Sequence, residues 1–284
     1  MHESSVRKLP PAIEAIWGDF LQGSEPPLVA YSNSIFLVTE TSDLLRLNDA
    51  DVNGLGAPAN GRETTKLAAN PRLVRDAGPV FFDDDHTGTG EVMAVFELTR
   101  LFLRVSGPMT VERSQLIKTG DLRTHNVIFL GSVTENPILA DLSLDQNFVI
   151  SQPPKPPTLW RNFVLNLHPK PGEKTHYAIE RDNETHVLRT DYAIVSFLPG
   201  VVTGRKIAIL AGLTTIGTQA AAQFVTTAGG AEDLLARLGS SGRDSTRKLP
   251  PFFQAVLKVD IEQDEILSIH CVATRAIRPR KPKY

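Results

Sequence analysis

Two segments of the chain place apolar residues at helical spacing. The first is PAIEAIWGDFLQG (residues 11–23), which begins with proline, ends with glycine and predicts a short helix. Its apolar face contains Ile13, Ile16, Trp17 and Phe20. The second is GEVMAVFELTRLFLRVS (90–106), which predicts an amphipathic helix that ends before Gly107-Pro108. Its apolar face contains Val92, Val95, Phe96, Leu98, Phe102 and Val105.

Shorter runs alternate or are continuously apolar, as is typical of strands. In the first half we expect strands in PLVAYSNSIFLV (27–38, broken at Ser32-Asn33-Ser34), TVERSQLI (110–117) and DLRTHNVIFLGS (121–132). In the second half we expect them in NFVLNLH (162–168), THYAIER (175–181), HVLR (186–189), DYAIVSFL (191–198) and KIAILAG (206–212). An Ala-rich helix follows Gly212, AEDLLARLGS (231–240) predicts another, and residues 252–277 predict a closing hairpin.

This order of elements predicts a single α/β domain over residues 1–284, with a mixed sheet between two layers of helices. The proline-dense SQPPKPPTLW (151–160) could divide it into lobes at 1–150 and 160–275. Residues 39–79 are polar and rich in Gly, Asn and Pro, so we expect a flexible insertion there. Residues 276–284 form a basic tail that we expect to be frayed.

Composition narrows the functional classes. The chain has 284 residues, 41% hydrophobic and 22% charged, with a net charge of −2, which gives no electrostatic reason to expect nucleic-acid or membrane binding. Cys271 is the single cysteine, so no internal disulfide forms, and its apolar surroundings favour a core position. The N-terminus lacks a long apolar run, so we expect a cytoplasmic protein. The seven histidines show no metal-binding spacing, and we expect neither metal nor cofactor.

Four loops could lie at the carboxyl ends of strands, where open α/β sheets bind ligands. They are rich in hydroxyl, amide and glycine groups, which hydrogen-bond polar ligands but are also common in ordinary turns. Two of them, after Leu130 and after Ala211, follow a strand–Gly–helix pattern that suits an anion, with backbone donors expected at Glu135–Ile138 and Thr218–Ala221. The candidate ligand contacts are Ser32, Asn33, Thr87, Thr89, Gly131, Ser132, Glu135, Asn136, Gly212, Thr214, Thr215, Gly217 and Thr218.

The segment VFFDDDHTGT (80–89) offers an alternative. Asp83 and Asp85 match the spacing of the nucleophile and acid/base carboxylates in haloacid-dehalogenase-type phosphatases, which hold Mg²⁺ between them. The apolar run before them is short, and no acidic pair follows downstream. An acidic loop that enters a helix at Gly90-Glu91 is the structural alternative.

The segments HTGTGEVMAVFELTRLF, NVIFLGSVTENPILADL and DYAIVSFLPGVVTGRKIAILAGLTTIGTQAAAQFVTT, together with the hairpin, resemble an uncharacterised bacterial α/β domain of the acidobacterial type. The resemblance covers roughly residues 10–275. That domain often follows a winged-helix or other helix-turn-helix segment. The resemblance therefore implies that this chain is a stand-alone version, a piece of a longer protein, or the partner of a DNA-binding module on another chain. The layout is also similar to type II periplasmic-binding-protein folds, which serve as effector sensors.

Three hypotheses follow. The first is a non-catalytic sensor domain that binds a small polar or anionic molecule, such as a nucleotide or an anionic metabolite, and signals to a protein partner. The second is an enzyme, Mg²⁺-dependent and phosphatase-like or nucleotide-processing, centred on Asp83 and Asp85. The third is a structural or assembly subunit whose loops are only turns.

Overall fold

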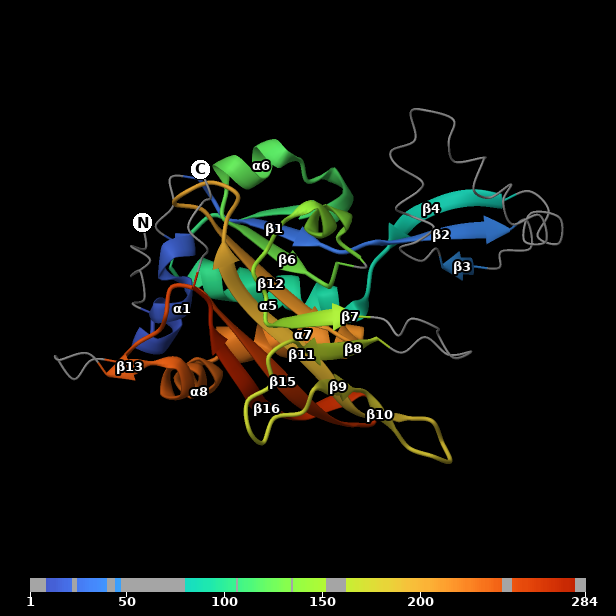
Figure 1. The fold of residues 1–284 in the computed structure, drawn as a ribbon. Coiled ribbons are helices and arrows are strands. Elements are labelled where there is room, and N and C mark those ends of the chain that lie inside the picture. Colours follow the sequence, from blue (N-terminus) through green and yellow to red (C-terminus); the bar gives the residue numbers. More distant parts are fainter. Residues whose placement is uncertain are drawn as a thin grey trace, which may run out of the picture.

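The computed structural model describes residues 9–21, 25–39, 44–46, 80–105, 107–133, 135–151, 162–241 and 247–278. Its centre is an eight-stranded mixed sheet (Figure 1). Seven strands follow one another in the order β16 (Glu265–Ala276), β15 (Phe253–Glu262), β11 (Leu188–Pro199), β12 (Lys206–Gly212), β6 (Val127–Leu130), β1 (Leu28–Tyr31) and β5 (Thr110–Arg113). The eighth, β10 (Glu180–Arg181), pairs with β11. The last four strands of that order run parallel and the first three antiparallel, which confirms the α/β prediction.

Four helices cover one face of this sheet. They are α1 (Pro11–Leu21), α5 (Thr89–Arg104), α7 (Thr215–Thr226) and α8 (Ala228–Leu238). Trp17 of α1 is completely buried there, and its ring packs edge-on against Phe20, Phe102 and Phe197. The indole Nε1 donates to the carbonyl of Val225 at 2.8 Å, so burial leaves this donor satisfied. The predicted N-terminal helix is therefore a central part of the core.

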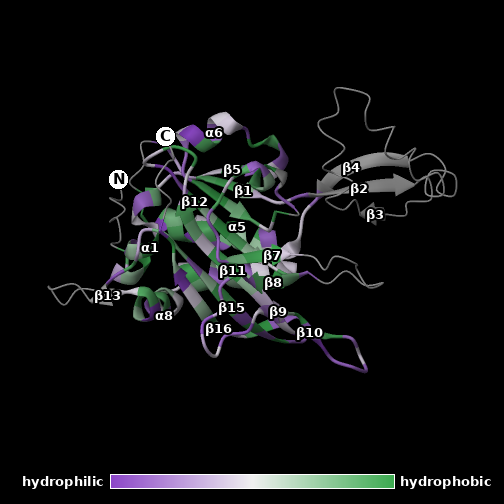
Figure 2. Ribbon diagram, in the orientation of Figure 1, coloured by the Kyte–Doolittle hydropathy of each residue, from purple (hydrophilic) through white to green (hydrophobic). Residues whose placement is uncertain are grey.

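The opposite face carries shorter elements. They are η1 (Ser114–Leu116), α6 (Thr119–Thr124), η2 (Pro137–Asp141) and a small sheet of β7 (Phe148–Ser151), β8 (Phe163–Asn166) and β9 (His176–Ala178). Strand β11 shows why both faces are covered: Ala193 and Val195 belong to the helix-side core, whereas Tyr192 and Ile194 pack under the small sheet. Apolar residues consequently fill the central strands, as the hydropathy colouring shows (Figure 2).

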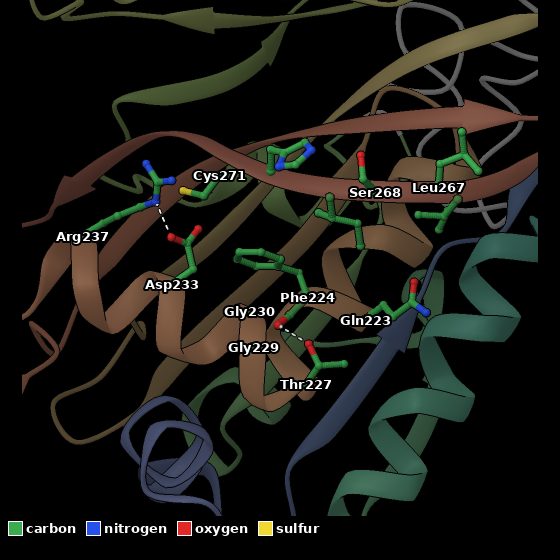
Figure 3. Close-up of a pocket in the computed structure, with 13 residues that line it drawn as sticks. Gln223, Phe224, Thr227, Gly229, Gly230, Asp233, Arg237, Leu267, Ser268 and Cys271 are labelled. Atoms are coloured by element: carbon green, nitrogen blue, oxygen red, sulfur yellow. Dashed lines mark hydrogen bonds and ion pairs between the residues drawn. The ribbon is translucent and has the colours of Figure 1, made fainter.

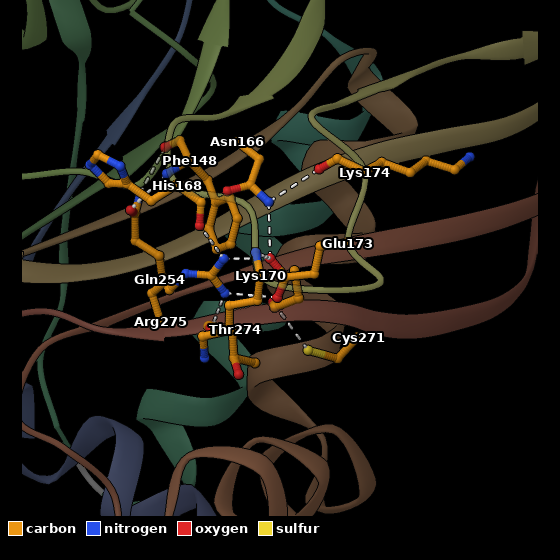
Figure 4. A network of polar contacts seen from close by, with 11 residues as sticks. Phe148, Asn166, His168, Lys170, Glu173, Lys174, Gln254, Cys271, Thr274 and Arg275 are labelled. Carbon is orange, nitrogen blue, oxygen red and sulfur yellow. Dashed lines mark hydrogen bonds and ion pairs between the residues drawn. The ribbon is translucent and has the colours of Figure 1, made fainter.

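A side-chain network fastens the small sheet to the central one (Figure 4). The Gln254 side chain of β15 accepts from the backbone N–H of Asn147 and Phe148, and it donates to the Phe148 carbonyl and to Ser196 Oγ. Beside it, the guanidinium of Arg275 donates to both oxygens of Glu173 and to the His168 carbonyl. These polar contacts add to the buried apolar cluster of Phe148, Val164 and Tyr177 against the central sheet.

Two further small sheets lie outside the central one. Strands β2 (Ser34–Thr39), β3 (Leu44–Arg46) and β4 (Val80–His86) pair antiparallel, and Figure 1 shows them projecting beyond the ends of the central strands. Strands β13 (Ser240–Ser241) and β14 (Arg247–Lys248) form a short ribbon. Apart from Thr39 and β3, the predicted insertion lies outside the described residues. The same is true of the proline-dense segment except Ser151, and of residues 279–284 of the tail.

Two predicted strands are shorter than the alternation suggested. TVERSQLI is a strand only as far as Arg113, and Ser114–Leu116 turn as a 3₁₀ helix. In DLRTHNVIFLGS the first residues belong to α6, and the strand β6 begins at Val127. Asp121 explains the second difference, because its carboxylate accepts from the backbone N–H of Lys118 at 2.8 Å and so caps the helix.

The central sheet takes strands from both of the intervals that we considered as lobes: β1, β5 and β6 come from the first, and the remaining strands come from the second.

The outer strand of the central sheet, β16, contains two β-bulges against β15. Ser268 pairs with Asp260 and Ile266 pairs with Ile261, so Leu267 is an extra residue in β16 at this point. Likewise, Ala273 pairs with Val256 and Cys271 pairs with Leu257, so Val272 is the extra residue of the second bulge. Among the described helices, none is long and apolar enough to span a bilayer.

Candidate functional site

The predicted loops meet at one edge of the central sheet. Strands β1, β6 and β12 are parallel neighbours in aligned register, with Tyr31 opposite Leu130 and Leu130 opposite Leu210. Their carboxyl ends therefore lie side by side, and the residues that follow them share that edge. We call this region, formed by Ser32-Asn33, Gly131–Val133, Glu135-Asn136, Thr87–Glu91 and Gly212–Thr218, the strand-end site.

The turn after β6 packs directly against the end of β1. Gly131 has a φ of 91°, and a Cβ built on it would lie 2.8 Å from Ser32 Oγ. Glycine is therefore required both for the backbone conformation and for the close approach. The buried Asn136 stabilises the turn, because its Nδ2 donates to the carbonyls of Leu130 and Ser132 at 2.9 and 3.1 Å. Its Oδ1 is also buried and has no hydrogen-bond partner among the described residues.

Hydrogen bonds join the loop before α5 to β1 and to the start of α7. Thr87 Oγ1 donates to the Ser32 carbonyl at 2.6 Å, and Gly90 N donates to Thr215 Oγ1 at 2.7 Å. Thr215 in turn donates to Glu91 Oε2 at 2.6 Å. A Cβ on Gly90 would lie 1.7 Å from the Thr215 carbonyl oxygen, so the two helix N-termini approach as closely as a glycine allows.

Two carboxyl groups lie within this arrangement. Glu91 is 6% exposed. Burial raises its pKa, the Thr215 hydrogen bond lowers it in part, and the charge of nearby Glu135 raises it further. Glu135 Oε2 accepts from both the backbone N–H and the hydroxyl of Ser132, at 3.1 and 2.7 Å. Acceptor oxygens are therefore a main feature of the strand-end site.

A third carboxylate occupies the N-terminus of α7. Asp191 of β11 is completely buried, and its Oδ2 accepts from the N–H of Thr214, the hydroxyl of Thr214 and the N–H of Gly217 at 3.2, 2.6 and 2.8 Å. Burial raises the pKa of Asp191 to about 6, although these bonds oppose the shift. Gly212 N also has a partner within the chain, because it donates to Thr218 Oγ1. The expected anion cradle is thus filled by the protein's own carboxylate.

The second expected set of backbone donors is also used internally. The N–H groups of Glu135 and Asn136 both donate to the Ser132 carbonyl, and that of Leu139 donates to Asn136. The helix that follows, η2, is a five-residue 3₁₀ turn rather than a regular helix, with Pro137 at its start. The prediction that Glu135–Ile138 presents amides to an anion is therefore not supported by this geometry.

A small cavity opens beside Ser132. Its volume is about 140 Å³, and its walls come from η2, β7, β11, β12 and the turn after β6. Most of its lining is apolar, contributed by Val133, Leu139, Val149, Ile150, Ile194, Ile209 and Ala211. Three polar side chains, Ser132, Gln146 and Ser196, also line it. Ser132 therefore connects the cavity with the Glu135 carboxylate.

The remaining predicted residues lie elsewhere or contribute little. Thr89 is exposed in the first turn of α5. Asp83 and Asp85 belong to β4, where Asp83 pairs with Phe36 of β2, outside the central sheet. Their side chains lie outside the described part of the structure. Within the described residues, no group of three His, Cys, Asp or Glu side chains is placed to hold a metal ion.

A different cavity, of about 510 Å³, lies between α7, α8 and β16 (Figure 3). Its lining contains none of the predicted contacts and includes Phe224, the Asp233–Arg237 ion pair and Cys271. Cys271 is buried, as predicted, and burial raises the pKa of its thiol to about 12, so it is a poor nucleophile.

Comparison with protein-family models, curated proteins and solved structures found no match for this chain. The family resemblance stays a prediction, and function has to be argued from the strand-end site. Sequence reasoning missed Asp191 as a site residue and treated Glu91 only as a helix-terminal carboxylate. A signal for Asp191 did exist: an acidic residue at the start of a long apolar strand is disfavoured unless something binds its oxygens.

Proposed function

We propose that this protein is a ligand-binding domain with a regulatory role, which holds a small polar molecule at the strand-end site without transforming it. The observation that carries the proposal is convergence. Three parallel strands and the starts of two helices bring hydroxyl, amide and carboxyl groups to one edge, beside a cavity lined by Ser132. Open α/β sheets use this edge for ligands.

The polar groups of the site support binding rather than chemistry. Glu91, Thr215 and Gly90 hydrogen-bond one another, and Glu135 is held by Ser132. Such a network is rigid and already oriented, so a ligand gains hydrogen bonds at a small cost in ordering the protein.

The regulatory part of the proposal follows from the elements that the site joins. A ligand that contacts both the turn after β6 and the start of α5 would stabilise their observed arrangement, and a protein partner could read that arrangement. The DNA-binding module implied by the family resemblance is one such partner.

A thermal-shift screen tests the binding function. Nucleosides, nucleotides, sugars, amino acids, polyamines and organic acids are added to the chain, and we expect one class to raise the melting temperature by about 5 °C at saturation. Chromatography of the ligand after incubation should recover it unchanged, because no reaction is proposed.

Val133→Trp is the matching site variant. Val133 lines the cavity and is 38% exposed, so an indole can cover the opening without entering the core. Val201→Trp is the control, since Val201 is a 40% exposed turn residue that does not line the cavity. We expect the ligand shift to disappear in Val133→Trp and to persist in Val201→Trp. A screen without any shift, or equal shifts in both variants, would contradict the function.

A further inference from the structure

The cavity beside Ser132 lies between the central sheet and the elements that cover its second face. Ile194 of β11 pairs with Ala211 of β12, and both side chains line the cavity. Two positions along β11, Ser196 pairs with Ile209, so these four side chains share one face of the sheet and form the floor of the cavity. From η2 and β7, three apolar side chains complete the lining: Leu139, Val149 and Ile150.

One side chain of this floor carries a donor that the protein does not use. Ser196 is completely buried, and its Oγ accepts from Gln254 Nε2 at 2.9 Å. A hydroxyl also has a proton to donate, and the described residues provide no acceptor for the one on Ser196. Gln254 Nε2 donates to the Phe148 carbonyl as well, so Ser196 is not its sole acceptor. Because a buried donor without a partner costs free energy, we expect a group inside the cavity to accept from Ser196.

The rest of the lining restricts the molecule to which that acceptor can belong. Ser132 donates its own hydroxyl proton to Glu135 Oε2, which leaves Ser196 as the hydroxyl donor of the cavity. None of the described residues that line the cavity is charged, so an ion placed there would lose its hydration without a counter-charge. The volume of about 140 Å³ is close to the roughly 150 Å³ of an engineered apolar cavity that holds one benzene ring. An uncharged body of about one ring matches this lining.

Resting on the proposed function, we propose that the ligand inserts an uncharged, ring-sized apolar group with a carbonyl oxygen into this cavity, as a small aromatic or cyclic ketone would. A carbonyl oxygen accepts hydrogen bonds without carrying a charge. Ser196 donates to it and is the residue that selects the ligand, while the apolar walls contact the ring. This ligand class differs from the anionic molecule expected from the strand–Gly–helix pattern.

Titrations of the whole chain followed by NMR test the inference with three one-ring probes. These are acetophenone, its hydrocarbon counterpart ethylbenzene and the anion benzoate, and we expect acetophenone to bind most tightly. Ser196→Ala deletes the donor, so the preference for acetophenone over ethylbenzene should fall about tenfold. Thr226→Val is the control, because it removes a buried hydroxyl of α7 on the other face of the sheet. It should leave the preference at the wild-type value.

A second variant keeps the test independent of folding. Ser196→Ala leaves Gln254 its bond to the Phe148 carbonyl, so we expect the variant to fold. Ser196→Cys retains the shape of the side chain but has a thiol, which is a weaker donor than a hydroxyl. It should lower the preference for acetophenone in the same direction and by a smaller factor.

The outcomes separate this inference from the proposed function. Tighter binding of ethylbenzene or of benzoate to the wild type would refute the ligand class, and an unchanged preference in both Ser196 variants would refute the role of Ser196. Either result leaves the binding function to the thermal-shift screen. If no probe binds and the screen has a hit, the inference fails alone. Failure of every probe and of every class in the screen would refute both proposals.

Discussion

Two buried carboxylate networks of this protein differ in how their charge is balanced. Glu173, in the loop between β8 and β9, is bound by the Arg275 guanidinium, whose hydrogen bonds lower the pKa of Glu173 to about 2 (Figure 4). Asp191 is bound by backbone N–H groups and a hydroxyl, all uncharged, and burial raises its pKa to about 6. The same functional group is thus stabilised as an anion in one place and disfavoured as one in the other.

This difference separates a structural role from a candidate functional one. The Glu173–Arg275 pair joins the small sheet to the central sheet, and the negative charge of Glu173 is balanced by the positive charge of Arg275. At the strand-end site, the hydrogen bonds to Glu91 and Asp191 come from neutral donors, an arrangement that costs stability and is typical of functional sites. Three experiments probe the comparison, from the largest expected effect to the smallest.

Replacing Arg275 by methionine should have the largest effect. The side chains of Arg275 and Glu173 are only 8% and 15% exposed, so the variant leaves a carboxylate buried without its cation. We expect a loss of about 3–5 kcal/mol in the free energy of unfolding, measured with urea. Arg237→Met is the control, because the Asp233–Arg237 pair is largely exposed and should contribute at most about 1 kcal/mol. Similar losses in both variants would show that burial of the Glu173 pair does not matter.

Stability should depend on pH with opposite sign at the two networks. The pKa of Asp191 is raised from 3.8 to about 6, so the folded state binds this proton more tightly than the unfolded state. Its contribution is therefore fully present below pH 3.8 and is lost as the pH rises to about 6, a change of about 3 kcal/mol. The pKa of Glu173 is lowered from 4.5 to about 2, so its contribution is present above pH 4.5 and is lost as the pH falls.

Urea denaturation of wild type and Asp191→Asn between pH 4 and 7 measures the first of these contributions. The wild type should lose stability relative to the variant as the pH rises. A difference that does not change with pH would mean that the Asp191 carboxyl is ionised throughout. The Glu173→Gln variant, studied between pH 5 and 3, isolates the opposite trend in the same way.

Removing one neutral donor from the strand-end site should have the smallest effect. Thr215→Val keeps the shape of the side chain but deletes the hydroxyl that donates to Glu91 and accepts from Gly90 N. We expect a loss of about 1–2 kcal/mol in the free energy of unfolding. Thr227→Val, which removes only the 3.3 Å bond from the exposed Thr227 side chain to the Phe224 carbonyl, should change it by less than about 0.5 kcal/mol. A loss as large as that of Arg275→Met would remove the distinction between neutral and charged partners.

Local patterns predicted much of the fold. Helical spacing of Ile13, Ile16 and Phe20 identified α1, and glycines at 131 and 212 marked the ends of β6 and β12. Both signals depend on neighbours in sequence, so they can be read from the chain directly. The α6 segment was misassigned because apolar alternation outweighed the capping carboxylate of Asp121.

The candidate site could be predicted only in part. The positions of Ser32, Gly131 and Gly212 followed from the rule that ligands bind at strand ends, and the structure brings these positions together. The hydrogen-bond partners did not follow from any such rule. Asp191 reaches Thr214 and Gly217 from another strand, and Thr215 reaches Glu91 across 124 positions of the sequence. Periodicity carries no information about contacts of this kind, and they decide which donors are available to a ligand.

The two bulges in β16 have a consequence for the chain in concentrated solution. An outer strand of 12 residues with regular backbone spacing would be a template for edge-to-edge association of copies. Leu267 and Val272 interrupt that spacing at two points, and each bulge twists the strand locally. Leu267 is nevertheless 61% exposed, so it is the backbone irregularity, rather than polarity, that opposes aggregation there. Deleting both bulged residues should restore a continuous edge and lower the solubility of the protein.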